Sequence, residues 1–143
     1  MFRTLVVVAD SGRARIYGWE GKGKPMLELA DLIHTEARMR EHEIHSDRPG
    51  RTFDSKGSGR HAMESSSPLK MQKETKFAGQ IVDYINVERN RHNFSDLVLI
   101  AAPGFLGELR KSLDRETGKL VTRQIDKNLV LQQESVIRKY LAA

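Results

Sequence analysis

Hydrophobic residues change their spacing in the middle of one segment, residues 96–113. Residues 97–102 are all apolar, which is typical of a strand covered on both faces. Beyond Pro103 the apolar positions recur every three or four residues, as on one face of a helix, at Leu106, Leu109 and Leu113. Proline is favoured in the first turn of a helix, so the boundary falls near Pro103. The segment predicts a buried strand that leads directly into a helix, and therefore a sheet that is at least partly parallel.

Apolar runs earlier in the chain predict three further strands, at residues 4–9, 14–19 and 27–33. Turn-forming residues separate these runs, Asp10-Ser11-Gly12 at the first junction and residues 21–25 at the second. Because both connections are short, we expect the three strands to form an antiparallel meander.

Two helices and one strand are predicted from the remaining periodic positions. Residues 70–91 form a helix whose apolar face comprises Phe77, Ile81, Tyr84 and Ile85. Residues 120–125 alternate like a half-exposed strand, and a last helix presents Val136, Ile137, Tyr140 and Leu141. The predicted order is βββαβαβα. It indicates an α/β fold of ribonuclease H-like architecture, with a mixed five-stranded sheet in a single domain over residues 1–143.

The segment before the first predicted helix, residues 35–69, lacks a hydrophobic period, so we do not expect it in the core. Residues 48–63 hold four Lys or Arg against one acid, with Gly and Ser that let backbone amides approach an anion. We predict a basic loop over residues 46–69 that contacts phosphate through Arg48, Arg51, Lys56, Arg60 and His61. Its predicted anchor to the domain comprises Asp47, Pro49 and Gly50. An interpretation of equal weight is that the segment binds no phosphate and is only a linker anchored to the domain.

Composition narrows the chemistry further. The 143 residues include no cysteine, which excludes disulfides, thiolate zinc sites and a cysteine nucleophile. A net charge of +5 permits a nucleic acid or another anionic partner. The first apolar run is too short for a signal peptide and no stretch is long enough to span a bilayer, so we expect a cytoplasmic protein.

Asp10 stands at the end of the first predicted strand, where a two-metal nuclease of this fold would place one carboxylate. The fourth strand ends in Ala101-Ala102-Pro103, where another acid is needed, and an Asp-Ser-Gly turn is a sufficient role for Asp10. Residues 18–24 resemble a P-loop, but Pro25 replaces the hydroxyl residue that would bind Mg²⁺. We therefore predict a hairpin connection there.

The remaining candidates for chemistry are histidines and one serine. His34, His42 and His45 are the candidate ligands for a metal, but their spacing does not match a zinc motif. We interpret them as solvated loop histidines. Ser58 lacks the strand and the first glycine of a nucleophile elbow. We expect no metal, no cofactor and no catalytic residue.

Three segments together resemble the bacterial host attachment protein family: residues 7–16 (VVADSGRARI), 46–51 (SDRPGR) and 97–110 (LVLIAAPGFLGELR). The resemblance extends over nearly the whole chain. It implies a role in attachment of bacteria to host cells. It also implies a fold similar to the central domain of archaeal and eukaryotic peptide-chain release factors.

In those release factors a Gly-Gly-Gln tip, carried on a loop before the long helix, enters the peptidyl transferase centre of the ribosome. The matching segment here is residues 46–69, and the residues in it most similar to that tip are Gly57-Ser58-Gly59-Arg60-His61. The resemblance thus implies a basic loop at the matching place, but this chain lacks the glutamine that coordinates the hydrolytic water.

Our leading hypothesis is a non-catalytic, cytoplasmic binding module whose basic loop contacts RNA or a ribosomal surface, with attachment to host cells as an indirect consequence. One alternative is an adhesion factor that touches the host or another anionic partner directly. Another is an enzyme, either a residual peptidyl-tRNA hydrolase or a metal-dependent nuclease.

Overall fold

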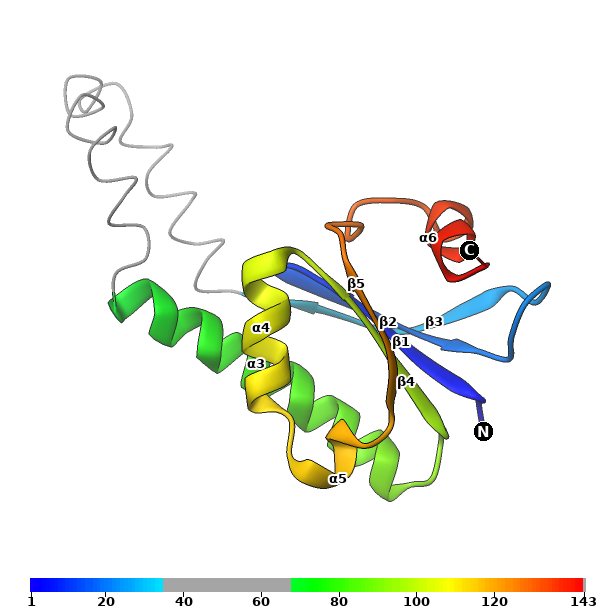
Figure 1. Ribbon diagram of the computed structural model, residues 1–143, viewed down its shortest axis with the longest axis horizontal. Coiled ribbons are helices and arrows are strands. Elements are labelled where there is room, and N and C mark those ends of the chain that lie inside the picture. The colour runs from blue at the N-terminus through cyan, green and yellow to red at the C-terminus, as the bar shows by residue number, and fades with distance from the viewer. Residues whose placement is uncertain (35–67, 143) are drawn as a thin grey trace.

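The computed structural model describes residues 1–34 and 68–142 (Figure 1). Its elements follow the predicted order, with bounds that differ from the predicted ones by about two residues or fewer at most ends. They are β1 (Thr4–Ala9), β2 (Arg13–Trp19), β3 (Met26–Ile33), α3 (Pro68–Asn90), β4 (Asp96–Ala101), α4 (Pro103–Ser112), α5 (Arg115–Gly118), β5 (Val121–Asp126) and α6 (Glu134–Ala142). The mixed α/β class is confirmed. The short helix α5 was not predicted.

The five strands form one mixed sheet in the order β3-β2-β1-β4-β5. β2 is antiparallel to both β1 and β3, as the predicted meander requires. β4 is parallel to β1, and β5 is parallel to β4. The hairpins arise because the connections of β2 are short, whereas a parallel strand needs a long crossover such as the one that includes α3.

Both faces of the sheet are covered, which explains the continuous apolar runs of β1 and β4. In β1, Leu5 and Val7 pack against α3 and α4, while Val6 and Val8 pack in a second cluster with Ile137 of α6. Successive side chains of a strand point to opposite faces, so a strand covered on both faces has no polar alternation. Figure 1 shows α3 and α4 on one side of the sheet and α6 on the other.

Helix α3 buries the face that its sequence predicts. Phe77, Ile81 and Ile85 are fully buried, and Tyr84 packs at the margin of the same cluster. These positions recur at helical spacing, so the helix presents one apolar stripe to the sheet and leaves its other sides to polar residues.

The C-terminal ends of β1, β3, β4 and β5 lie at one edge of the sheet, which we call the carboxyl edge. The register shows this directly, because Ala9 pairs with Ala101 and Ala101 pairs with Asp126. Helix α4 begins at this edge with Pro103, and α3 begins on the same side (Figure 1). The first described range ends at His34, directly after β3, and the second begins at Pro68, the first residue of α3. The opposite edge, where β1 and β4 begin, is the amino edge.

Candidate functional site at the carboxyl edge

Asp10 is the first residue after β1 and organises the turn into β2. Its Oδ1 atom accepts hydrogen bonds from the backbone N–H groups of Gly12 and Arg13, at 2.8 and 2.9 Å. The backbone N–H of Asp10 also donates to the carbonyl oxygen of Arg13, at 2.9 Å. A short acidic side chain that accepts from amides two and three residues later is typical of an Asx turn. The predicted structural role of Asp10 is therefore confirmed.

Arg13 holds the same turn to the end of β3. Its guanidinium donates two hydrogen bonds to the carboxylate of Asp31, at 2.9 and 2.6 Å. This pairing lowers the pKa of Asp31, chiefly through the hydrogen bonds from Arg13. The pair therefore ties the turn after β1 to β3.

Strand β4 ends at the carboxyl edge without an acid. Ala101 is followed by Ala102, which is the N-cap of α4, and by Pro103 in the first turn. In the described ranges, 1–34 and 68–142, no three His, Cys, Asp or Glu residues come together as metal ligands would.

The interpretation of His34 as a solvated loop histidine is wrong. Only 5% of the residue is exposed, and its ring stacks on Phe77 with the ring centroids 4.8 Å apart. Its Nδ1 atom lies 2.9 Å from the carbonyl oxygen of Ser11, so that nitrogen donates to the turn after β1. Its Nε2 atom is buried and has no hydrogen-bond partner in the described part of the chain. His34 thus ties the end of β3 to the turn and to α3.

Two helices begin on the side of the carboxyl edge. Helices α3 and α4 both begin here, and neither has an acidic residue in its first turn. Ala102, the N-cap of α4, provides no side-chain hydrogen bond to the first amides. Free amides at a helix N-terminus, together with the helix dipole, favour an anion.

Lysines add full charges to these partial ones. Helix α3 has a lysine at every third position of its first turns, at Lys70, Lys73 and Lys76. Lys127 follows β5 at the same edge and is exposed. Asp126 directly precedes Lys127, and Glu74 and Glu108 lie on the same two helices, so these acids offset much of the lysine charge. The α3 lysines were not predicted as part of a site, although their regular spacing in a predicted helix is visible in the sequence.

The residues predicted to contact phosphate lie outside the described part of the chain. These are Arg48, Arg51, Lys56, Arg60 and His61, together with the anchor residues Asp47, Pro49 and Gly50. His42, His45 and Ser58 also lie outside it. The predictions for all of them, and for a basic loop over residues 46–69, stay predictions. Of that range, only Pro68 and Leu69 are described, and they are the first two residues of α3.

The P-loop-like residues form a hairpin connection, as predicted. Trp19 ends β2 and Met26 begins β3, and these two residues are paired across the hairpin. The backbone N–H of Lys24 donates to the carbonyl oxygen of Gly21, at 3.0 Å, which closes the turn. A P-loop would require a helix at this place.

A mixed five-stranded sheet with helices on both faces defines this chain as an α/β protein. Comparison with known families supplies the next step. Residues 5–141 match the family described as "protein required for attachment to host cells", and the chain belongs to this family. A comparison with curated proteins finds no match. No helix within the described ranges has both the length and the apolar composition needed to cross a lipid bilayer.

Proposed function

We propose that this protein is a non-catalytic, cytoplasmic binding protein that holds RNA at the carboxyl edge of its sheet. Membership of the attachment family points to a role in attachment to host cells. In this proposal that role is indirect, because the protein acts on RNA or on a ribosomal RNA surface inside the producing cell. The basic segment, residues 46–69, supplies further cations through Arg48, Arg51, Lys56 and Arg60.

The observation that carries the proposal is that α3 and α4 both begin on the side of the carboxyl edge without an acid in the first turn. Lys73 and Lys127 add charge beside these N-termini. Affinity for nucleic acid comes mostly from phosphate contacts of this kind. The last described residue before the basic segment is His34, which follows β3 at this edge.

The strand order also supports a finer assignment of the fold. A sheet of order β3-β2-β1-β4-β5, in which β2 alone runs against the other strands, agrees with a ribonuclease H-like architecture. We include in the proposal a single domain over residues 1–143 and a likeness to the central domain of release factors. A loop in that domain acts on the ribosome, which is why a ribosomal RNA surface is part of the proposed function.

Filter binding of structured RNA tests the proposal. Contacts with three or four phosphates give a slope of about −3 in a plot of log affinity against log salt concentration, and each lost cation reduces that slope by about one unit. We expect the double variant Lys56→Ala plus Arg60→Ala, and the single variant Lys73→Ala, to bind more weakly with a smaller slope. Lys111→Ala is the matched control, because this exposed lysine lies at the C-terminal end of α4. Equal affinity and slope in all four proteins would refute the proposal.

The family description also favours a second candidate, a factor that adheres directly to the host. Fractionation of the producing cells separates the two, because direct adhesion requires the protein on the cell surface. Protease treatment of intact cells should leave a cytoplasmic protein undigested. Digestion of the protein under these conditions would instead support direct adhesion.

An enzymatic function is the third candidate. RNA cleavage and aminoacyl-ester cleavage can be assayed with Mg²⁺ and with a chelator to distinguish a nuclease from a residual peptidyl-tRNA hydrolase. The hydrogen bonds of Asp10 with Gly12 and Arg13 support a structural role for the one acid at the end of β1. Metal-independent ester cleavage that is lost on substitution of Gly59 or His61 would overturn the non-catalytic proposal.

A further inference from the structure

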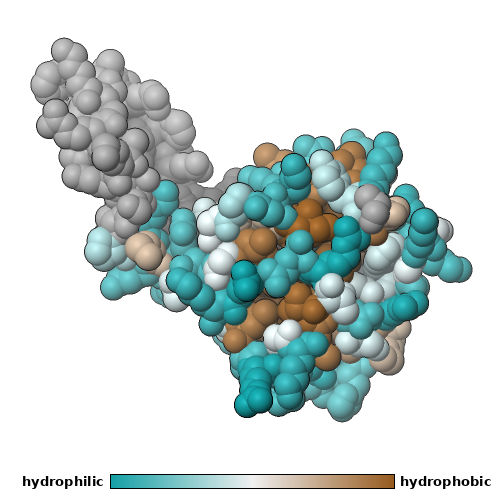
Figure 2. Space-filling model, in the orientation of Figure 1, coloured by the Kyte–Doolittle hydropathy of each residue, from teal (hydrophilic) through white to brown (hydrophobic). Residues whose placement is uncertain are grey.

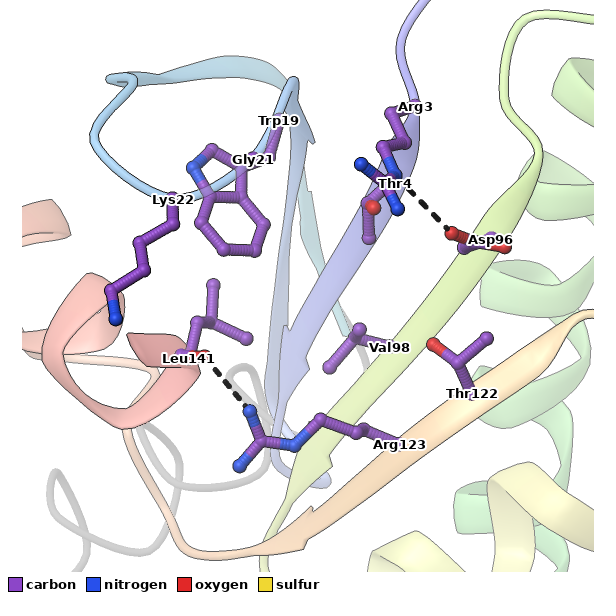
Figure 3. Close-up of a pocket in the computed structure, with 10 residues that line it drawn as sticks. All are labelled: Arg3, Thr4, Trp19, Gly21, Lys22, Asp96, Val98, Thr122, Arg123 and Leu141. Carbon is purple, nitrogen blue, oxygen red and sulfur yellow. Dashed lines mark hydrogen bonds and ion pairs between the residues drawn. The ribbon is translucent and has the colours of Figure 1, made fainter. Parts of the chain in front are cut away.

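A pocket of about 260 Å³ lies at the amino edge of the sheet, on the face covered by α6 (Figure 3). It is lined by the end of β2, the beginnings of β1, β4 and β5, and the last turn of α6. Figure 2 shows hydrophilic side chains over most of the visible surface, with hydrophobic patches near edge strand β5. None of the residues discussed for the carboxyl edge lines this pocket, so the two sites are independent.

Trp19 forms the aromatic wall of the pocket. Its indole Nε1–H donates to the carbonyl oxygen of Lys24 at 3.0 Å, which holds one edge of the ring against the β2–β3 turn. Val98 and Leu141 supply an apolar floor, and both belong to the hydrophobic cluster under α6. A ring whose polar atom is already paired offers its remaining surface for stacking and apolar contact.

Three cations surround this apolar centre: Arg3, Lys22 and Arg123. Asp96 is the one acid that lines the pocket, and it lies 3.9 Å from the guanidinium of Arg3. Among the described residues, Lys22 has no hydrogen-bond or ion-pair partner. Three cations and one acid leave a net positive charge, so the pocket suits a ligand with about two negative charges.

Arg123 is held in place by the end of α6. Its guanidinium donates to the carbonyl oxygens of Leu141 and Tyr140, at 2.9 and 3.3 Å. A guanidinium has five N–H donors, so these bonds leave others for a ligand. Figure 3 shows the Arg123 head group next to Leu141 and the Lys22 side chain on the other side of that residue. The positive charges therefore lie around the apolar floor.

We propose that this pocket binds an aromatic ring that carries a phosphate group, as in a mononucleotide. The ring packs against Trp19 and the apolar floor, and the phosphate lies beside Lys22 at the rim of the pocket. Stacking of a base on an aromatic side chain contributes favourably whatever the base. The volume is slightly below the usual range of ligand pockets, about 300 to 1,000 Å³, which suits a single nucleotide unit that stays partly exposed. The same unit is present in free nucleotides and in RNA.

Trp19 is the only tryptophan of the chain, so its fluorescence reports on this pocket alone. We expect AMP to change the emission of Trp19 in a saturable way. Adenosine lacks the phosphate and ribose 5-phosphate lacks the ring, so each should bind at least about tenfold more weakly than AMP. A hexa-adenylate that binds more tightly than AMP would support a nucleotide within RNA as the source, and a weaker one would support a free nucleotide.

Lys22→Ala tests the charge without disturbing the fold, since Lys22 lies in an exposed turn. Loss of an exposed ion pair predicts AMP binding that is roughly two- to fivefold weaker. Lys111→Ala is the matched control, because Lys111 is equally exposed but lies on α4, which covers the other face of the sheet. The proposal is overturned if AMP gives no saturable change, if adenosine or ribose 5-phosphate binds as tightly as AMP, or if Lys22→Ala and Lys111→Ala bind alike.

Discussion

Replacing Asp10 by alanine removes the acceptor of two backbone hydrogen bonds, at 2.8 and 2.9 Å, in the turn between β1 and β2. A hydrogen bond to a charged acceptor contributes about 1.5 to 3 kcal/mol. The turn is only partly buried, so the freed amides of Gly12 and Arg13 regain some hydration. We therefore expect a total loss of about 2 to 3 kcal/mol in the free energy of unfolding. For a domain of this size the melting temperature should fall by roughly 6 to 12 °C.

Asp10→Asn is the informative companion variant, because asparagine keeps an oxygen at the same position and favours the same turn. Its stability should stay within about 1 kcal/mol of wild type. Urea unfolding followed by circular dichroism measures both variants, and the denaturant dependence should be unchanged. If Asn destabilises as much as Ala, the acceptor role assigned to Asp10 is wrong. If a folded Asp10→Asn protein loses a Mg²⁺-dependent RNA cleavage that wild type shows, the carboxylate is catalytic and the proposed function fails.

Two further predictions concern the β2 hairpins. A Cβ atom at Gly18 would lie 2.5 Å from the ring of Phe2, so Gly18→Ala must displace that ring. The free energy of unfolding, measured by chemical denaturation, should fall by about 1 to 3 kcal/mol. A variant as stable as wild type would show that Phe2 moves freely. The pKa of Asp31 is lowered by its hydrogen bonds with Arg13, so this pair stabilises the fold above about pH 4 and the contribution is lost as the pH falls through the lowered pKa. The free energy of unfolding in urea, measured between pH 7 and 3, should therefore decline less in Asp31→Asn than in wild type. The difference is roughly 0.5 kcal/mol or less, because the pair is part-exposed. Equal declines in the two proteins would contradict the linkage.

Much of the candidate site at the carboxyl edge was predictable because its signals are local. The Asp10 turn, the strand that ends at Ala101 and the start of α4 at Pro103 each lie within a few consecutive residues. The position of His34 was not predictable. Its burial depends on stacking with Phe77, 43 positions away in the chain, and no spacing in the sequence reports that contact.

The amino acid sequence by itself determined the order of the elements, the direction of the strands and the buried faces of the helices. Hydrophobic spacing specifies these features, because each element must bury its own apolar face. Only the tertiary structure decided which polar groups meet. The pocket at the amino edge joins Trp19, Val98, Arg123 and Leu141 from four separate elements. Such a meeting depends on strand register and helix docking, which set distances between residues that no local pattern connects.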